Sequence, residues 1–238
     1  MPSERMRKLY QFVGDTLFIP DTKIGWKPKA VRAARSVLQK GQFDLIFATA
    51  PPQTDFLIGE ALKKKFRLPL VLDYRDAWLD YPFKYFPTAG HRYLHYRMEK
   101  RVVKASDRII VTARRVKESL LKRYLTLGYH DVVIIPQGYD PEDFEHSTPR
   151  KAAARRKMRI THAGTFYAER NPSVLLQALH NVFRSTPQLR GRIELCFVGT
   201  LRDEDRILVR KLGLQNDVLL PGYVEHRECT RYLVDSDI

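Results

Sequence analysis

The sequence predicts an α/β protein with two successive domains, each built around an open, mostly parallel sheet. Short apolar runs alternate with segments of helical spacing through most of the chain, which is typical of strand–helix–strand units. A stretch rich in arginine, lysine and proline interrupts this alternation once, after which it begins again. We therefore expect a first domain at residues 1–146, a basic linker at 147–157 and a second domain at 158–238.

In the first domain, four apolar runs predict buried parallel strands, at residues 43–50, 68–74, 108–112 and 132–136. Apolar residues at helical spacing predict helices at 53–66, 91–104 and 116–127. Residues 1–41 contain nine basic and three acidic residues, and only 29–39 are predicted there as a helix. The alternation indicates a sheet covered on both faces, with ligands gathering at the carboxyl ends of its strands.

The second domain repeats the pattern with fewer strands. Its strands are predicted to end at Gly164, Gly199 and Gly222, with helices at 172–185, 203–212 and 225–235. A sheet of three strands leaves an apolar edge unpaired, so we expect the second domain to be incomplete. A basic segment also stands where a first strand and a glycine-rich turn are expected, so we expect truncation at both ends.

The composition favours an anionic partner. Lys and Arg number 42 against 27 Asp and Glu, and the resulting charge of +15 suits nucleic acid, an anionic membrane face or a phosphorylated small molecule. The sequence carries no helix-turn-helix, zinc or RNA-recognition signature, so we expect no specific nucleic-acid partner. Two cysteines without ligand spacing fit a reducing cytoplasm, and we find neither a signal peptide nor an apolar run of about 20 residues. We expect a cytoplasmic protein, soluble or peripheral at the inner face of the membrane.

The stretch from Gly164 to Pro172 has the features of a phosphate-binding loop. It follows a predicted strand, carries the Thr165 hydroxyl and the Arg170 guanidinium, and leads through Asn171 into a helix. Free N–H groups at a helix start and a nearby cation attract anions, especially phosphate. An ordinary strand–helix connection has the same local pattern, so the loop alone leaves both interpretations open.

Several stretches resemble, in the same order, the family-4 glycosyltransferases from about residue 42 to the end of the chain. They are FDLIFATAPP, LPLVLDYRDAW, ASDRIIVTA, VVIIPQGYDPEDF, HAGTFYAERNPSVLLQAL, IELCFVG and VLLPGYVEHRECTRYLVDSDI. The resemblance implies the GT-B fold of two Rossmann-like domains, with the nucleotide-sugar donor on the second and the acceptor on the first. The RDAW and GTFYAERNP stretches are similar to the branch that acts on surface polysaccharides.

The resemblance also implies a donor site in the second domain. Gly164 matches the glycine of the family's diphosphate loop, and Arg170 stands at the position of its lysine. Thr165 replaces the arginine that is usual in this loop, so one of the two diphosphate cations has to come from elsewhere. Further donor contacts are implied at Gly199, Gly222 and Tyr223.

On the acceptor side, Arg75 and Asp76 stand where many relatives have a His-Asp pair, and they are the implied catalytic residues. An arginine stays protonated and cannot act as a base, whereas Asp76 could orient an acceptor hydroxyl or stabilise positive charge on the sugar. An Asp beside an Arg is also a common structural ion pair. We reject Asp73 and Asp76 as a hydrolytic acid–base pair because both come from one strand end. The remaining acceptor-side residues are Asp73, Gln137 and Gly138.

By resemblance, the reaction is transfer of a hexose to an acceptor hydroxyl with retention, without cofactor or metal. Asp203 to Asp205 open a predicted helix and are interpreted as an N-terminal charge cluster rather than a metal motif. The positive charge would suit a saccharide or lipid-linked acceptor at an anionic membrane face, with residues 91–123 as the first docking candidate. The family's two glutamates that contact the donor sugar and ribose would lie beyond Ile238. A non-catalytic nucleotide-sugar-binding remnant is therefore the alternative, and we expect weak or no transfer by this chain alone.

Overall fold

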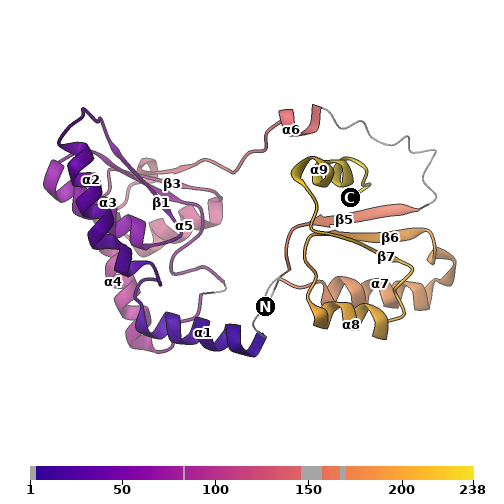
Figure 1. The fold of residues 1–238 in the computed structure, drawn as a ribbon. Helices are drawn as coiled ribbons and strands as arrows, with labels where there is room; N and C mark the ends of the chain where they lie inside the picture. Colours follow the sequence, from indigo (N-terminus) through magenta and orange to yellow (C-terminus); the bar gives the residue numbers. More distant parts are fainter. Residues whose placement is uncertain (1–3, 83, 146–156, 167–169) are drawn as a thin grey trace. The chain divides into compact units, whose positions relative to one another are not determined.

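The computed structural model describes residues 4–82, 84–145, 157–166 and 170–238. The chain divides into two compact units, Met1–Gly138 and Tyr139–Ile238, each with its own parallel sheet (Figure 1). The predicted α/β class with two parallel sheets is thus confirmed. All but one residue of the predicted linker at 147–157 lie outside the described residues, so its boundaries stay a prediction.

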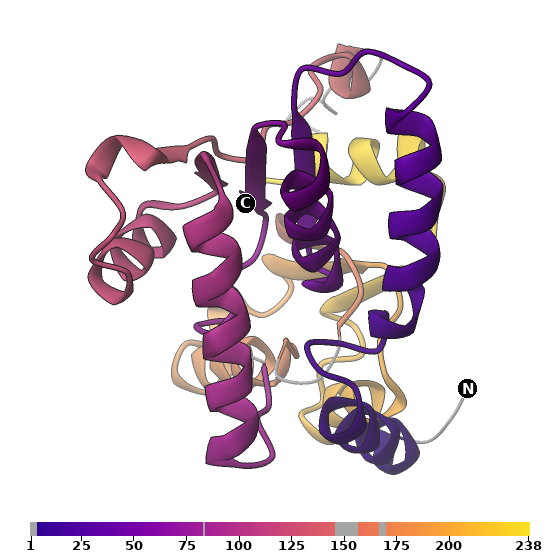
Figure 2. The ribbon, with the colours of Figure 1, turned by 90° about the vertical axis from the view of Figure 1, so that its left-hand side faces the viewer.

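The sheet of unit 1 has four parallel strands in the order β1-β2-β3-β4. They are β1 (Ile46–Ala50), β2 (Leu70–Tyr74), β3 (Arg108–Val111) and β4 (Val132–Ile134). The helices of this unit are α1 (Glu4–Leu17), α2 (Lys27–Leu38), α3 (Thr54–Phe66), α4 (Ala89–Ala105) and α5 (Arg114–Arg123). Figure 2 shows α2, α3 and α4 side by side in one layer. Each strand and helix expected between residues 29 and 136 is therefore present, with ends shifted by a few residues.

Close packing of α3 on the sheet depends on Gly59. A Cβ atom there would lie 2.9 Å from Leu70 Cδ1 and 3.1 Å from Ala48 Cβ, so any larger side chain would push the helix outward. Beneath it, Leu70, Leu72 and Tyr74 alternate along β2 and are fully buried. They form one core with side chains from α2, α3, α4 and α5.

The opposite face of this sheet is more open than the sequence led us to expect. Phe47 of β1 is 56% exposed between the buried Ile46 and Ala48, and Val133 of β4 is 43% exposed next to the buried Val132. Strands in consecutive order are joined by right-handed crossovers, which place successive helices on the same face. The expectation of helices on both faces was therefore wrong for the described part of unit 1.

Unit 2 has three parallel strands in the order β5-β6-β7. They are β5 (Met158–Ala163), β6 (Ile193–Val198) and β7 (Val218–Gly222). Figure 1 shows α7 (Ser173–Ser185) and α8 (Asp203–Lys211) on one face and α9 (His226–Val234) on the other. The backbones of Asp237 and Ile238 hydrogen-bond to the outer edge of β5, with Ile238 O accepting from Thr161 N at 2.8 Å.

Two of the described α-helices were not predicted. The first is α1, in a segment where only residues 29–39 were predicted as helical. The second is α6 (Glu142–Glu145), at the end of the predicted first domain, where no helix was predicted. It belongs to unit 2, where Asp143 Oδ1 lies 2.9 Å from His226 Nε2 of α9. No helix in the described part of the chain is long and apolar enough to cross a membrane.

Candidate functional site

Three glycines form the carboxyl edge of the sheet in unit 2. Gly164 follows β5, Gly199 follows β6 and Gly222 ends β7, with φ angles of +148°, +131° and +83°. Gly164 N donates to Val198 O and Gly199 N donates to Gly222 O, each at 2.8 Å. Side chains rarely tolerate such φ values, so this edge presents bare backbone. A ligand can approach bare backbone closely.

The loop after β5 is fixed from below by an aromatic side chain. Phe166 is 9% exposed and packs edge-on against Phe197 of β6, with ring centroids 5.2 Å apart. On its other side it stacks on the imidazole of His162 at 4.3 Å. Gly164 and Thr165, which lie between these two residues in sequence, are exposed. The loop therefore carries the two predicted donor residues on a packed support.

Arg170 and the start of α7 lie at the other end of this loop. Arg170 is exposed, and Asn171 Oδ1 accepts a hydrogen bond from Ser173 N at 3.0 Å. The helix begins at Ser173, one residue later than predicted, and the bond from Ser173 N to Asn171 Oδ1 is of the kind that a capping side chain makes at a helix start. Partial burial and the charge of Arg170 lower the pKa of the nearby His162.

The remaining predicted donor residue is Tyr223, which follows Gly222 directly and is 89% exposed. The described fold thus places every predicted donor residue at or next to one edge of one sheet. His162 was not predicted as a site residue. The only sequence signal for it is its position two residues before Gly164, which puts both on the same face of an extended strand.

In unit 1, Arg75 and Asp76 lie at the carboxyl edge, directly after β2. Arg75 N donates to Ala50 O at 3.1 Å, and Arg75 O accepts from Thr112 Oγ1 at 3.3 Å. Both side chains are exposed. Asp73 differs, because it lies within β2 and belongs to the partly open face of the sheet. The exposed residues Gln137 and Gly138 follow β4.

The segment after Asp76 is anchored to α4 and α5 by buried groups. Trp78 is 1% exposed, and its Nε1 donates to His95 Nδ1 at 2.9 Å. Burial lowers the pKa of His95 to about 4, with a further contribution from Lys84, so the imidazole is neutral and accepts this bond.

A second anchor links α5 to the same segment. Arg123 contacts the carboxylates of both Asp80 and Glu99. Tyr124 donates its hydroxyl proton to Glu99 Oε2 at 2.7 Å. Burial raises the pKa of Glu99 to about 7 despite these two partners. None of these anchoring residues was predicted, because their partners are remote in sequence.

Comparison with known proteins identifies the family. Residues 2–143, more than half of the chain, match the profile of Glycosyltransferase Family 4. The chain belongs to glycosyltransferase family 4. The D-inositol 3-phosphate glycosyltransferase of Xylanimonas cellulosilytica is 26% identical over 157 residues, which are 59% of this chain and 36% of that protein.

Solved structures match the fold of this family-4 chain. Sucrose-phosphate synthase from Thermosynechococcus elongatus superposes with a TM-score of 0.66 at 19% identity, covering 92% of this chain and 55% of that one. Alr3699/HepE of Anabaena, in complex with UDP and glucose, has a TM-score of 0.63 at 16% identity, covering 90% and 54%. The chain thus spans about half the length of these structures, and the predicted GT-B fold class is confirmed.

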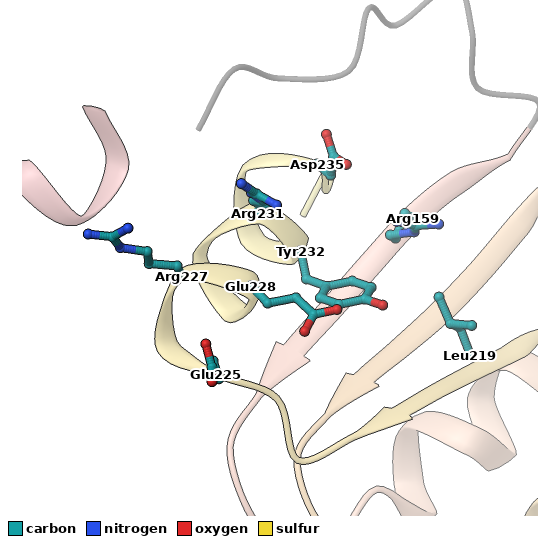
Figure 3. A pocket seen from close by; sticks show the side chains of 8 residues that line it. All are labelled: Arg159, Leu219, Glu225, Arg227, Glu228, Arg231, Tyr232 and Asp235. Carbon is teal, nitrogen blue, oxygen red and sulfur yellow. The ribbon is translucent and has the colours of Figure 1, made fainter. Parts of the chain in front are cut away.

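Unit 2 of the family-4 chain also has a hollow of about 780 Å³ beneath α9 (Figure 3). It is lined by Arg159, Leu219, Glu225, Arg227, Glu228, Arg231, Tyr232 and Asp235. Figure 3 shows Glu228 and Tyr232 pointing from α9 toward the strands, whereas Arg227 points away. Because the lining balances three arginines with three carboxylates, it offers an anion no net attraction. The hollow is therefore distinct in character from the glycine edge.

The acidic cluster at Asp203 to Asp205 is engaged within the protein. Arg202 Nε and Nη2 hold the two oxygens of Asp205 at 2.7 and 2.9 Å, and Arg202 also pairs with Glu204. This agrees with a charge cluster at the start of α8. Across residues 4–82, 84–145, 157–166 and 170–238, no three His, Cys, Asp or Glu side chains group as a metal site requires.

Proposed function

We propose that this chain is part of a glycosyltransferase that moves a hexose from a nucleotide sugar to an acceptor hydroxyl, in the synthesis of a surface polysaccharide or glycolipid. The observation that carries the proposal is the glycine edge of unit 2 with Arg170 beside it, in a chain of glycosyltransferase family 4. The reaction is proposed to retain the anomeric configuration and to need no metal.

The donor diphosphate is proposed to lie against Gly164, Thr165 and Gly199. Backbone without side chains lets phosphate oxygens approach N–H groups closely, and Arg170 neutralises charge that develops on the leaving diphosphate. The nucleotide base is proposed to lie against Gly222 and the exposed ring of Tyr223. Support comes from HepE, whose structure of the same fold was determined with UDP and glucose.

The acceptor is proposed to contact unit 1 at the carboxyl edge of its sheet. Asp76 would orient the attacking hydroxyl or stabilise positive charge on the sugar, and Arg75 would contribute charge rather than act as a base. Gln137 and Gly138 are proposed to line the same edge. Asp73 is a weaker member of this set, because its side chain belongs to a face rather than the edge.

The acceptor is further proposed to be presented at an anionic membrane. Met6, Tyr10, Val13 and Leu17 recur at helical spacing along α1 and are 47%, 63%, 41% and 69% exposed. An exposed apolar stripe on a short helix fits the boundary between lipid headgroups and acyl chains. In the same unit, residues 91–123 carry eleven basic and three acidic residues, which attract anionic headgroups.

The donor proposal is tested by calorimetric titration of the chain with UDP, GDP and ADP and with their sugar conjugates. We expect binding of one nucleoside diphosphate, weakened by about 1.5–3 kcal/mol in Arg170→Ala, since a hydrogen bond to a charged group is lost. The matched control is Arg184→Ala, because Arg184 is an exposed arginine at the opposite end of α7. Equal affinities of the two variants would remove Arg170 from the site.

Two other classes of function are outcomes of the same experiment. Nucleotide-sugar binding without transfer to any acceptor by the full-length protein would favour a non-catalytic binding protein. Absence of nucleotide binding, together with steeply salt-dependent binding to mixed-sequence DNA, would favour a basic nucleic-acid-binding protein.

A further inference from the structure

The proposed donor site has one arginine for a ligand that carries two phosphates. In the loop itself, Thr165 stands between Gly164 and Phe166 and contributes a hydroxyl rather than a charge. We propose that His162 supplies the second cationic contact to the donor diphosphate, from the strand rather than from the loop. This inference rests on the proposed function and adds a specific residue to its site.

The position of the imidazole supports this role. A Cβ atom built on Gly164 would lie 3.4 Å from His162 Nε2, so the ring edge overhangs the glycine that heads the site. The ring stacks on Phe166 with an interplanar angle of 22°. Since Phe166 is itself packed on Phe197, the imidazole is supported in one orientation. His162 nevertheless remains exposed, so that a ligand can reach its edge.

The electrostatics also agree. Among the described residues, Arg170 is the charged group whose field lowers the pKa of His162, together with partial burial. A protonated imidazole and the Arg170 guanidinium repel each other, which is why the Arg170 charge disfavours protonation of His162. A diphosphate placed between them reverses the sign of that interaction and favours protonation of the imidazole. Binding of the anion is therefore coupled to uptake of a proton by His162.

A simpler interpretation is that His162 only packs on Phe166. The variant His162→Phe distinguishes packing from phosphate binding, because phenylalanine keeps a ring for the stack but has no N–H donor and no charge. The double variant His162→Phe/Thr165→Arg then places a cation in the loop itself, directly after Gly164. Far-UV circular dichroism and thermal unfolding establish that each variant is folded before binding is measured.

The experiment is calorimetry of the chain with UDP, GDP and ADP near pH 6 and near pH 8, in buffers of different ionisation enthalpy. We expect His162→Phe to weaken the preferred nucleotide about tenfold or more near pH 6, and to take up fewer protons than the wild type. The nucleotide's own phosphate also titrates near pH 6, and comparing variant with wild type at the same pH subtracts this contribution to the measured proton uptake. The double variant is expected to regain affinity but not proton uptake.

The outcomes separate this inference from the proposed function. If wild type binds and Arg170→Ala weakens binding, while His162→Phe matches wild type in affinity and proton uptake, the role of His162 is refuted and the donor site stands. If wild type binds none of the three nucleotides, the proposed function fails and the inference fails with it.

Discussion

Replacing Gly199 with alanine tests whether the two strand ends of unit 2 meet as closely as the structure indicates. The added Cβ would lie 2.3 Å from Gly164 O, and real Cβ contacts essentially never fall below 3.0 Å. The backbones would have to separate by 3.0 − 2.3 = 0.7 Å at least. Overpacking of this kind costs about 1–3 kcal/mol, and a side chain at positive φ costs about 1–2 kcal/mol more. We expect Gly199→Ala to lower the free energy of unfolding of unit 2 by about 2–5 kcal/mol.

The matched control is Gly222→Ala. Gly222 also has a positive φ, +83°, but nothing lies within 4 Å of its added Cβ, so only the conformational cost remains. Urea unfolding is followed by tryptophan fluorescence and by far-UV circular dichroism. Both tryptophans, Trp26 and Trp78, lie in unit 1, so fluorescence reports that unit alone. The dichroism transition should shift to lower urea in Gly199→Ala while the fluorescence transition stays. Equal shifts in the two alanine variants would refute the close approach.

Two further predictions concern unit 1. Burial raises the pKa of Glu99 from 4.5 to about 7, so the folded protein holds a proton that the unfolded chain releases. Stability should therefore fall by up to about 3 kcal/mol as the pH rises through this window, and Glu99→Gln should abolish that loss in fluorescence-monitored urea titrations. The lowered pKa of His95 makes stability rise with pH below pH 6.5, but His95 is present in wild type and variant, so its effect cancels in the comparison. A pH profile of stability that is the same in Glu99→Gln and wild type would contradict the raised pKa of Glu99. Separately, Leu17→Glu should reduce co-sedimentation with phosphatidylglycerol vesicles, whereas Leu125→Glu, at a 91% exposed position outside α1, should not; equal loss would exclude α1 as the contact.

The strands and most helices could be predicted because each bears its signal locally. The runs at β1 to β7 are short, apolar or (in β5) alternating apolar and polar, and closed by glycine, proline or a polar residue, which is typical of strands in parallel sheets. The covered face could not be predicted, because it depends on strand order. The strands β1 to β4 lie in consecutive order in the sheet, and Phe47 is exposed on its open face. The sequence of β1 alone does not reveal which strands will lie beside it. The helix α1 was missed because the exposed apolar residues Met6, Tyr10, Val13 and Leu17 do not by themselves predict which part of the chain the helix packs against.

Candidate site residues could be predicted where a glycine or a charge stands at a strand end. Gly164, Arg170 and Gly222 fall in this class, and they are found at one edge. His162 could not be found in this way, since a polar residue alternating along a strand is most simply a solvated one. Its electrostatic interaction with Arg170 and the burial of its stacking partner Phe166 depend on the folded structure and leave no local signal in the sequence.

The two units support their candidate residues by the same physical means. In each, a buried aromatic lies two residues after an exposed candidate: Phe166 follows Gly164, and Trp78 follows Asp76. Each aromatic contacts a histidine, by stacking in one case and by a hydrogen bond in the other. An exposed polar side chain gains little free energy from its own position, whereas burying an aromatic contributes about 1.5–3 kcal/mol. Because only one residue separates the two in sequence, the core fixes the backbone of the candidate residue without contacting its functional group. The position of these edges is thus set by the core, while the exposed side chains at the edges are not needed for it.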